Sequence, residues 1–200
     1  AEKSVNAYNT LKDWGMQIFL GSVTSAPGVA TSVEAQADNM FYLTPSASST
    51  DVTAGKDNMY QLCFADPNQG TGSATYMNAN MADSKIAVIY RNDDAYSQGI
   101  RDTFVAQAAT EGIEIVYEGT FTEDAQSDFS VQLTAAQSAG ADLLFLPIYY
   151  QPATMFMTQA KDIIAADAVY YGCDGFDGIE GMEGFDINEI PQAITMLSHF

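Results

Sequence analysis

The chain has 200 residues, of which 47% are hydrophobic, and this is enough to bury the core of one or two globular domains. Its 7 basic and 26 acidic side chains give a net charge of −19, which argues against nucleic acid and against an anionic membrane surface as partners. No apolar run in the sequence reaches the length of a membrane span, so direct membrane insertion of this segment is not expected.

The first predicted element is a helix. Residues 1–15 are expected to form the second half of a helix, which favours a processed or excised piece of a longer protein. Pro27 suits the first turn of a second helix. A further helix is expected to begin with Asp66 as its cap, because Gln69 follows at the spacing of a capping box. Gly140 is a natural end for a helix within residues 128–140.

Eight short apolar runs predict β-strands, and helical segments separate most of them. The runs cover residues 16–21, 40–44, 59–64, 85–90, 113–118, 142–148, 168–172 and 194–200. Alternation of strand and helix at this spacing predicts parallel sheets with crossover helices. The runs are apolar on both faces, as strands covered by helices on both sides are. The fold class is therefore α/β.

A polar, helix-poor segment at residues 44–58 marks a change of organisation along the chain. We expect a boundary between two lobes near Ala65, with residues 1–65 as a partial N-terminal lobe and residues 66–200 as the second lobe. The first lobe would hold only three strands, and no helix follows the last predicted strand. Both ends of the chain are therefore expected to be cut.

Several catalytic arrangements are absent from the sequence. His199 is the only histidine, which excludes HExxH zinc sites and argues against a Ser-His-Asp triad. No G-x-S-x-G motif and no Walker A motif occur. The stretch "GTGSAT" at 70–75 begins like a dinucleotide-binding loop, but Thr75 stands at its third glycine position, inside the predicted helix. No enzyme and no cofactor are expected.

Two other features have a plain and a functional interpretation. Acidic residues recur at every third position across residues 173–189, which favours a solvated loop, with a calcium site as the alternative. Cys63 and Cys173 stand far apart in apolar contexts. Two buried thiols are the preferred interpretation, and a disulfide is the alternative.

Small polar and hydroxylated residues follow several predicted strands. These junctions are residues 21–28, 44–51, 91–99, 149–152 and 172–178. In a parallel sheet, the carboxyl ends of the strands meet at one edge, where ligands bind. Junctions from the two lobes would face each other across a cleft. The alternatives are that the serines only cap helices and that the tyrosines only pack on a loop.

The two lobes offer complementary groups for a zwitterion. Hydroxyl and backbone N–H groups of Ser25, Ser46 and Ser48, with a helix N-terminus near Pro27, suit a carboxylate whatever the total charge. On the other side, Asp174 is a candidate acceptor for an ammonium. Aromatic rings could complete the wall; they belong to Tyr96, Tyr149 and Tyr150. A site for a carboxylate that faces an acceptor for an ammonium matches the two charged groups of an amino-acid backbone.

Six stretches, in this order, closely resemble the Leu/Ile/Val-binding proteins of ABC transporters, which are type 1 periplasmic binding proteins. They are "GSVTSAPGVA", "YLTPSASSTDVT", "CFADPNQGTGSATYM", "AYSQG", "DFSVQLTAAQSAGADLLFLPIYYQPA" and "YGCDGFDG". The resemblance covers essentially the whole chain. It implies the type 1 periplasmic-binding-protein fold, with parallel sheets, helices on both faces and two lobes. Family members also begin earlier and continue further, so the first lobe is expected to be incomplete.

The resemblance also implies roles for individual residues. Ser25 matches the serine that holds the ligand carboxylate, and Asp174 matches the acidic residue that takes the ligand ammonium. The other implied contacts come from a backbone group of Ser46, the hydroxyl of Ser48, and the rings of Tyr96 and Tyr149.

In function, the resemblance implies the extracytoplasmic solute-binding component of an ABC importer. Such a protein is either periplasmic or a lipoprotein at the cell surface. Its ligand would be a branched-chain or similar small amino acid, and its partner an ABC permease in the membrane. The alternative is a ligand-sensing domain of the same fold in a regulator or receptor. An enzyme on a doubly wound fold comes third.

Overall fold

The computed structural model of the protein describes residues 1–198, in which eight strands form two parallel sheets. The strands are β1 (Ile18–Leu20), β2 (Phe41–Thr44), β3 (Met59–Gln61), β4 (Ile86–Arg91), β5 (Ile115–Phe121), β6 (Leu143–Leu146), β7 (Val169–Gly172) and β8 (Ala193–Met196). The helices are α1 (Glu2–Trp14), α2 (Ser25–Ala37), α3 (Asp66–Asn80), α4 (Ala95–Glu111), α5 (Ser130–Ser138) and α6 (Tyr150–Ala160). Each predicted apolar run overlaps a strand, and the α/β class is confirmed.

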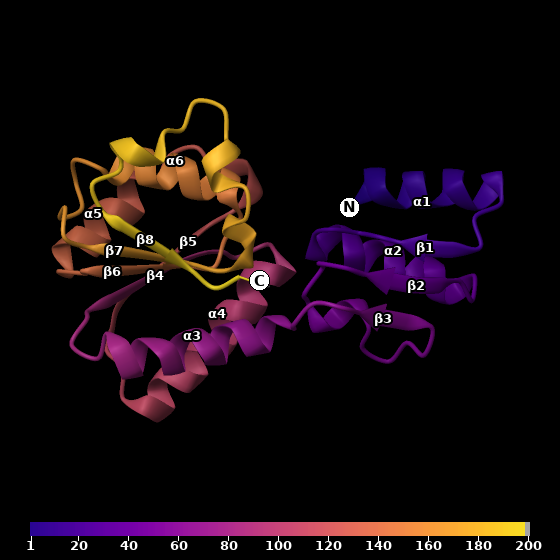
Figure 1. The fold of residues 1–200 in the computed structure, drawn as a ribbon, viewed down its shortest axis with the longest axis horizontal. Coiled ribbons are helices and arrows are strands. Elements are labelled where there is room, and N and C mark those ends of the chain that lie inside the picture. Colours follow the sequence, from indigo (N-terminus) through magenta and orange to yellow (C-terminus); the bar gives the residue numbers. More distant parts are fainter. Residues whose placement is uncertain (199–200) are drawn as a thin grey trace.

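The two sheets lie side by side in the molecule (Figure 1). One has the order β1-β2-β3 and the other the order β5-β4-β6-β7-β8, and every neighbouring pair is parallel. The described chain passes from one sheet to the other at residues 62–65, just before α3. The lobe boundary near Ala65 stays a prediction, although the change of sheet falls at this place.

The five-stranded sheet is covered on both faces. Along β6, Leu143 and Phe145 pack against α3 and α4, while Leu144 and Leu146 pack against α5 and α6. Figure 1 shows these helix pairs above and below the sheet. Alternate burial on two faces explains why the strand is apolar throughout, because neither set of side chains meets water. The prediction of helices on both faces is confirmed for this sheet.

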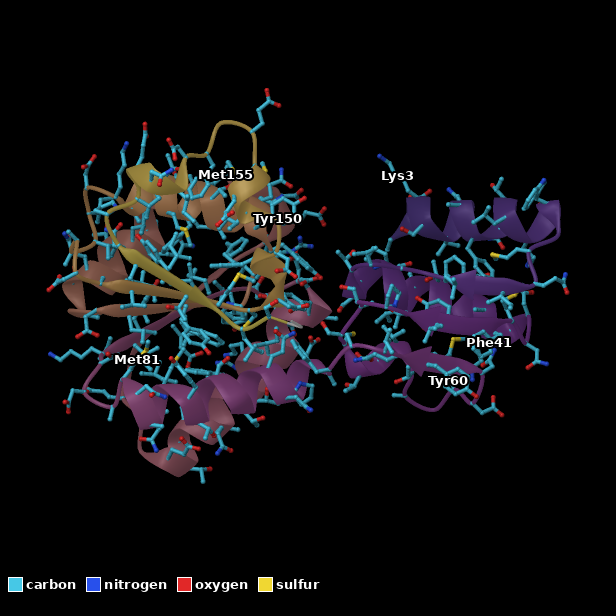
Figure 2. The ribbon with its side chains drawn as sticks, in the orientation of Figure 1. Lys3, Phe41, Tyr60, Met81, Tyr150 and Met155 are labelled. Carbon is cyan, nitrogen blue, oxygen red and sulfur yellow. The ribbon has the colours of Figure 1, made fainter. Side chains whose placement is uncertain are left out.

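The three-stranded sheet carries helices α1 and α2 on one face only. Phe19, Tyr42 and Met59 point toward these helices, and their neighbours along each strand point away. The outward set is apolar and exposed; it comprises Ile18, Leu20, Phe41, Tyr60 and Leu62. Phe41 and Tyr60 stack with ring centroids 5.3 Å apart on this face (Figure 2). Among the described residues, no helix covers it.

The start of α3 differs from the expectation. Ala65 is the N-cap, and Asp66 is already the first helical residue, so its side chain makes no cap bond. Gln69 does not close a capping box, because its side-chain oxygen accepts the backbone N–H of Asp174, 3.2 Å away. A tertiary contact within the second lobe therefore takes the place of the capping box. The end of α5 agrees with expectation, since Gly140 follows the helix in the left-handed region, with φ of 71°.

Helices α3 and α4 touch closely at Gly70. A Cβ atom at this position would collide with Thr103 Oγ1 and with the carbonyl oxygen of Ile100, and would lie 2.7 Å from the backbone nitrogen of Phe104. The first glycine of "GTGSAT", Gly70, therefore serves helix packing. The stretch lies within α3, as expected.

The remaining expectations concern cysteines and metals. Cys63 is half-buried and Cys173 is fully buried, and both are free thiols, so the disulfide alternative is wrong and Cys63 is less buried than expected. Within residues 1–198, no three histidine, cysteine or acidic side chains are placed to hold a metal ion. His199 lies outside the described residues. Across the same range, the structure contains no helix with the length and apolarity that a bilayer crossing needs.

Candidate functional site

The loops that follow the strands of both sheets meet where the two lobes touch. From the first lobe come the N-terminus of α2 and the loop after β2. From the second lobe come the N-termini of α4 and α6 and the turn at Asp174–Phe176 after β7. Because all neighbouring strands in each sheet are parallel, the loops after the strands lie at one edge of each sheet, as expected.

Tyr149 joins the two lobes directly. It is the N-cap of α6, and its hydroxyl accepts the backbone N–H of Ser25 over 3.4 Å. Ser25 begins α2, so this N–H is one of the donors that a helix N-terminus leaves without an internal partner. The Ser25 hydroxyl accepts the backbone N–H of Ser49, 3.1 Å away. An oxygen atom from the second lobe therefore occupies the expected carboxylate position.

Tyr96 and Asp174 form a buried pair behind Tyr149. The Tyr96 hydroxyl donates to Asp174 Oδ1 at 2.7 Å and accepts the backbone N–H of Gly175 at 2.8 Å. The rings of Tyr96 and Tyr149 stack with centroids 4.5 Å apart. Asp174 is expected opposite Ser25, and the structure places the two tyrosines between them. Burial raises the pKa of both phenols, so each stays a neutral hydrogen-bonding group.

The two other predicted serines lie in the loop after β2. Ser48 is buried; its carbonyl oxygen accepts the backbone N–H of Asp66 at 2.9 Å, and its side chain lies beside the Asp66 carboxyl. Ser46 is half-buried and donates its backbone N–H to Thr44 Oγ1, 3.3 Å away. Neither role in ligand binding is tested by these contacts, so both stay predictions.

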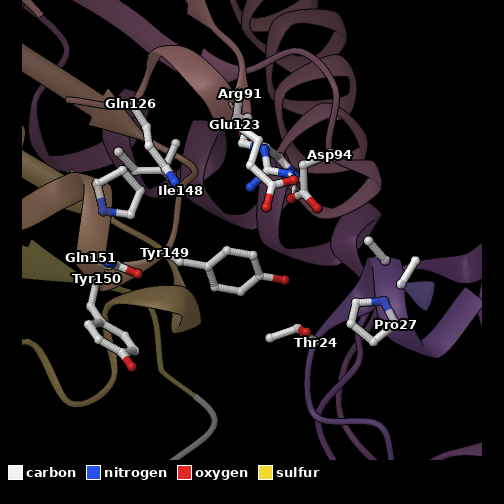
Figure 3. A pocket seen from close by; sticks show the side chains of 14 residues that line it. Thr24, Pro27, Arg91, Asp94, Glu123, Gln126, Ile148, Tyr149, Tyr150 and Gln151 are labelled. Carbon is white, nitrogen blue, oxygen red and sulfur yellow. Dashed lines mark hydrogen bonds and ion pairs between the residues drawn. The ribbon is translucent and has the colours of Figure 1, made fainter. Parts of the chain in front are cut away.

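A cavity of about 350 Å³ opens beside Tyr149, between the lobes (Figure 3). This volume falls at the lower end of small-molecule sites. Its lining comprises Ala1, Thr24, Ala26, Pro27, Arg91, Asp94, Ser97, Glu123, Gln126, Ile148, Tyr149, Tyr150, Gln151 and Pro152. Tyr149 and Tyr150 belong to the predicted set. Ser25, Ser48, Tyr96 and Asp174 do not line the cavity, because they are buried where the lobes touch, with exposed fractions of 0, 1, 1 and 8%.

Sequence reasoning missed the polar groups at one end of this cavity. Arg91 donates to Asp93 Oδ1 at 2.7 Å and to Glu123 Oε2 at 3.1 Å. Asp94 is the N-cap of α4 and accepts the backbone N–H of Ser97. Arg91 and Asp94 lie within the predicted junction at residues 91–99, which was a signal for them. Glu123 and Gln126 follow β5 without any motif that marks them.

A buried carboxyl lies at the passage between the lobes. Asp66 is 1% exposed, and neither of its carboxyl oxygens has a hydrogen bond of good geometry. Burial, above all, raises the pKa of Asp66 from 3.8 to about 7, and the charges of Asp174, Asp94 and Asp51 add to this effect, while Ser48 opposes it. Asp66 therefore holds a proton more tightly in the folded protein than in the unfolded chain.

We expect this carboxyl to make stability fall as pH rises. Between pH 3.8 and about 7 the folded state keeps the proton that the unfolded state has lost, so the free energy of unfolding decreases over this range. Asp66→Asn should remove that loss and stabilise the protein by about 2 kcal/mol at pH 8, with little effect at pH 4. Urea unfolding at both pH values measures the difference. The exposed Asp83→Asn is the control, and an equal response of the two variants would contradict the expectation.

Comparisons with known proteins give one consistent result. The periplasmic binding protein family matches residues 1–182. Leu/Ile/Val-binding protein homolog 3 of Brucella melitensis is 31% identical over 163 residues, which cover 80% of this chain and 44% of that protein. The solved structure of the leucine-binding protein LivK of Thermotoga maritima is 24% identical, with a TM-score of 0.84, over 92% of this chain and 52% of that one. LivJ of Streptococcus pneumoniae, solved in complex with isoleucine, is 27% identical with a TM-score of 0.73, over 88% and 48% of the two chains.

These matches confirm the resemblance to Leu/Ile/Val-binding proteins and the type 1 fold. The chain spans 44% of the length of the curated Brucella relative.

Proposed function

Because the chain belongs to the periplasmic binding protein family, we propose that it is a solute-binding protein that captures an amino acid between its two lobes. The observation that carries this proposal is the cavity beside Tyr149, which lies between the N-terminus of α2 and the loops of the second lobe. Ligands of open α/β sheets bind at this edge of the strands.

The ligand backbone would use two groups that are each hydrogen-bonded to a tyrosine hydroxyl in this structure. The N–H of Ser25 donates to the Tyr149 hydroxyl and would donate to a ligand carboxylate in its place. Asp174 would accept the ligand ammonium while keeping its bond to Tyr96. Since Ser25 and Asp174 are buried between the lobes, the lobes must part for a ligand to reach them. Residues 62–65, the single described passage between the sheets, would be part of the hinge.

The protein would act outside the cytoplasm and deliver its ligand to an ABC permease, without catalysing a reaction. The names of the relatives support this role, since they are amino-acid-binding proteins. The ligand would be an amino acid, and the Brucella relative is named for three of them, leucine, isoleucine and valine.

A thermal-shift screen of the protein against the twenty amino acids tests this function. A ligand at a hundred times its dissociation constant should add about 2.7 kcal/mol of stability, because it binds only the folded state. For a chain of this length the melting temperature should then rise by roughly 5–10 °C. The control is a set of amines and carboxylic acids that lack the other charged group. If no amino acid at millimolar concentration stabilises the protein, the proposal is wrong.

A further inference from the structure

The lining of the cavity beside Tyr149 contains both apolar and charged groups. The apolar groups are Pro27, Ile148, Pro152 and the tyrosine rings. Arg91, Asp94 and Glu123 lie together and form its charged end (Figure 3). An apolar ligand side chain would cover these charged groups without replacing their contacts to water, and this is unfavourable. The charged end therefore calls for a polar group on the ligand.

Negative charge dominates at the charged end. The guanidinium of Arg91 already donates to Asp93 and Glu123. Asp94 is 3% exposed and lines the cavity, and its hydrogen bond within the protein is the one that Oδ2 accepts from the N–H of Ser97. Among the side chains that line the cavity, the Arg91 cation thus faces the two carboxylates of Asp94 and Glu123, an excess of one negative charge. Burial is the main cause that raises the pKa of Asp94, and a further cation beside it would lower that pKa again.

The charged end lies within reach of the same ligand as the backbone groups. Tyr149 lines the same cavity as Asp94, and its hydroxyl accepts the backbone N–H of Ser25. Asp174 lies on the side of the Tyr96 ring, which stacks on Tyr149, whereas Asp94 lines the open cavity. A ligand whose backbone is held by Ser25 and Asp174 can therefore extend its side chain past Tyr149 toward Asp94.

We infer that this cavity selects an amino acid whose side chain ends in a cationic or hydrogen-bond-donating group, with Asp94 as its acceptor. This inference rests on the proposed function and names the ligand class of the same site. An anionic side chain would meet an excess of negative charge, and an aliphatic one would leave the Asp94 carboxylate buried against carbon.

Titration calorimetry with L-lysine, L-leucine and L-glutamate tests the selection. We expect L-lysine to bind at least about tenfold more tightly than L-leucine, and L-glutamate to bind more weakly than either. If L-leucine binds more tightly than L-lysine, this inference is wrong and the proposed function stands. If none of the twenty amino acids binds, the proposed function itself is wrong, and the inference falls with it.

Asp94→Asn separates a role in selection from a role in folding. Asparagine caps helices about as well as aspartate, so α4 should keep its N-terminus and the melting temperature should change little. We expect affinity for L-lysine to fall about thirtyfold, since truncating one side of a buried charge pair has at least this effect, and affinity for L-leucine to change by less than about threefold.

The matched control is Asp124→Asn. Asp124 is exposed, lies next to Glu123 and does not line the cavity, yet its replacement changes the net charge by the same amount. Both ligands should bind this variant as they bind the original protein. Equal losses of L-lysine affinity in the two variants would show that the loss comes from long-range electrostatics. That result would contradict a role of Asp94 as the acceptor. Equal losses for L-lysine and L-leucine in Asp94→Asn would overturn it as well.

Discussion

Asp174→Asn is expected to weaken amino-acid binding by about 2–5 kcal/mol, the range for truncating one partner of a buried, hydrogen-bonded charge pair. Asp174 is 8% exposed and lies in the turn after β7, where the lobes touch. In a cleft closed around a ligand, an ammonium needs an acidic partner, because an unpaired buried charge is strongly unfavourable. Titration calorimetry with the amino acid found in the ligand screen measures the loss.

Asparagine is the better replacement than alanine at this position. The sequence suggests that Asp174 has no structural partner, so that its removal would leave folding nearly unchanged. The structure contradicts this, because the buried Tyr96 hydroxyl donates to Asp174 Oδ1. Alanine would leave that hydroxyl without its acceptor and destabilise the fold, whereas asparagine keeps an oxygen there.

Asp177→Asn is the matched control for Asp174→Asn. Asp177 stands three residues further along the same turn and is exposed. Its variant should bind the ligand almost normally. Equal, small losses in both variants would show that Asp174 acts only as part of the acidic surface and makes no contact with the ligand ammonium.

Gly70→Ala is expected to destabilise the protein by about 3 kcal/mol or more. The added methyl group would meet Thr103 and the backbone of Ile100 and Phe104, and backbone atoms cannot move aside as a flexible side chain can. Helices α3 and α4 would have to separate, although they cover one whole face of the five-stranded sheet. Urea unfolding gives the change in the free energy of unfolding.

Gly72→Ala tests whether the loss comes from helix contact. Gly72 lies two residues further along α3, is exposed, and has no atom within 4 Å of an added Cβ. Alanine loses less conformational entropy than glycine on entering a helix, so this variant should be more stable by about 0.5–1 kcal/mol. Destabilisation in both variants would mean that the glycines serve the backbone of α3 itself.

Much of the fold could be predicted because strand burial leaves a strong pattern in the sequence. β6 is apolar at every position since Leu143 and Leu144 meet helices on opposite faces of the sheet. β1 and β2 belong to a sheet with one open face, yet Ile18 and Phe41 on that face are apolar too, so the sequence could not distinguish a covered face from an open one. The capping box at the start of α3 was predicted wrongly because the Gln69 side chain instead accepts the backbone N–H of Asp174, far along the chain.

The candidate site could be predicted only in part. Ser25 and Tyr149 were found from their places after strands, but their contact joins residues 124 positions apart, and no local pattern encodes it. A cleft between the lobes was expected, and residues of three predicted junctions, 21–28, 91–99 and 149–152, line the cavity. Glu123 and Gln126 were not expected there, because polar residues on a loop without a motif are indistinguishable from solvent-exposed ones in a sequence.

In the proposed binding mode, the hydroxyl of Tyr149 would compete with the ligand. It accepts the N–H at the N-terminus of α2, so a ligand carboxylate would have to replace one oxygen by another there. Displacing a neutral hydrogen bond of about 1 kcal/mol would lower the apparent affinity of every ligand by roughly fivefold. A carboxylate would recover this loss, because its charge makes the new bond about twice as strong, while an alcohol or amide would only match what it displaces. The Tyr149 hydroxyl would thereby discriminate against neutral solutes before any ligand side chain is recognised.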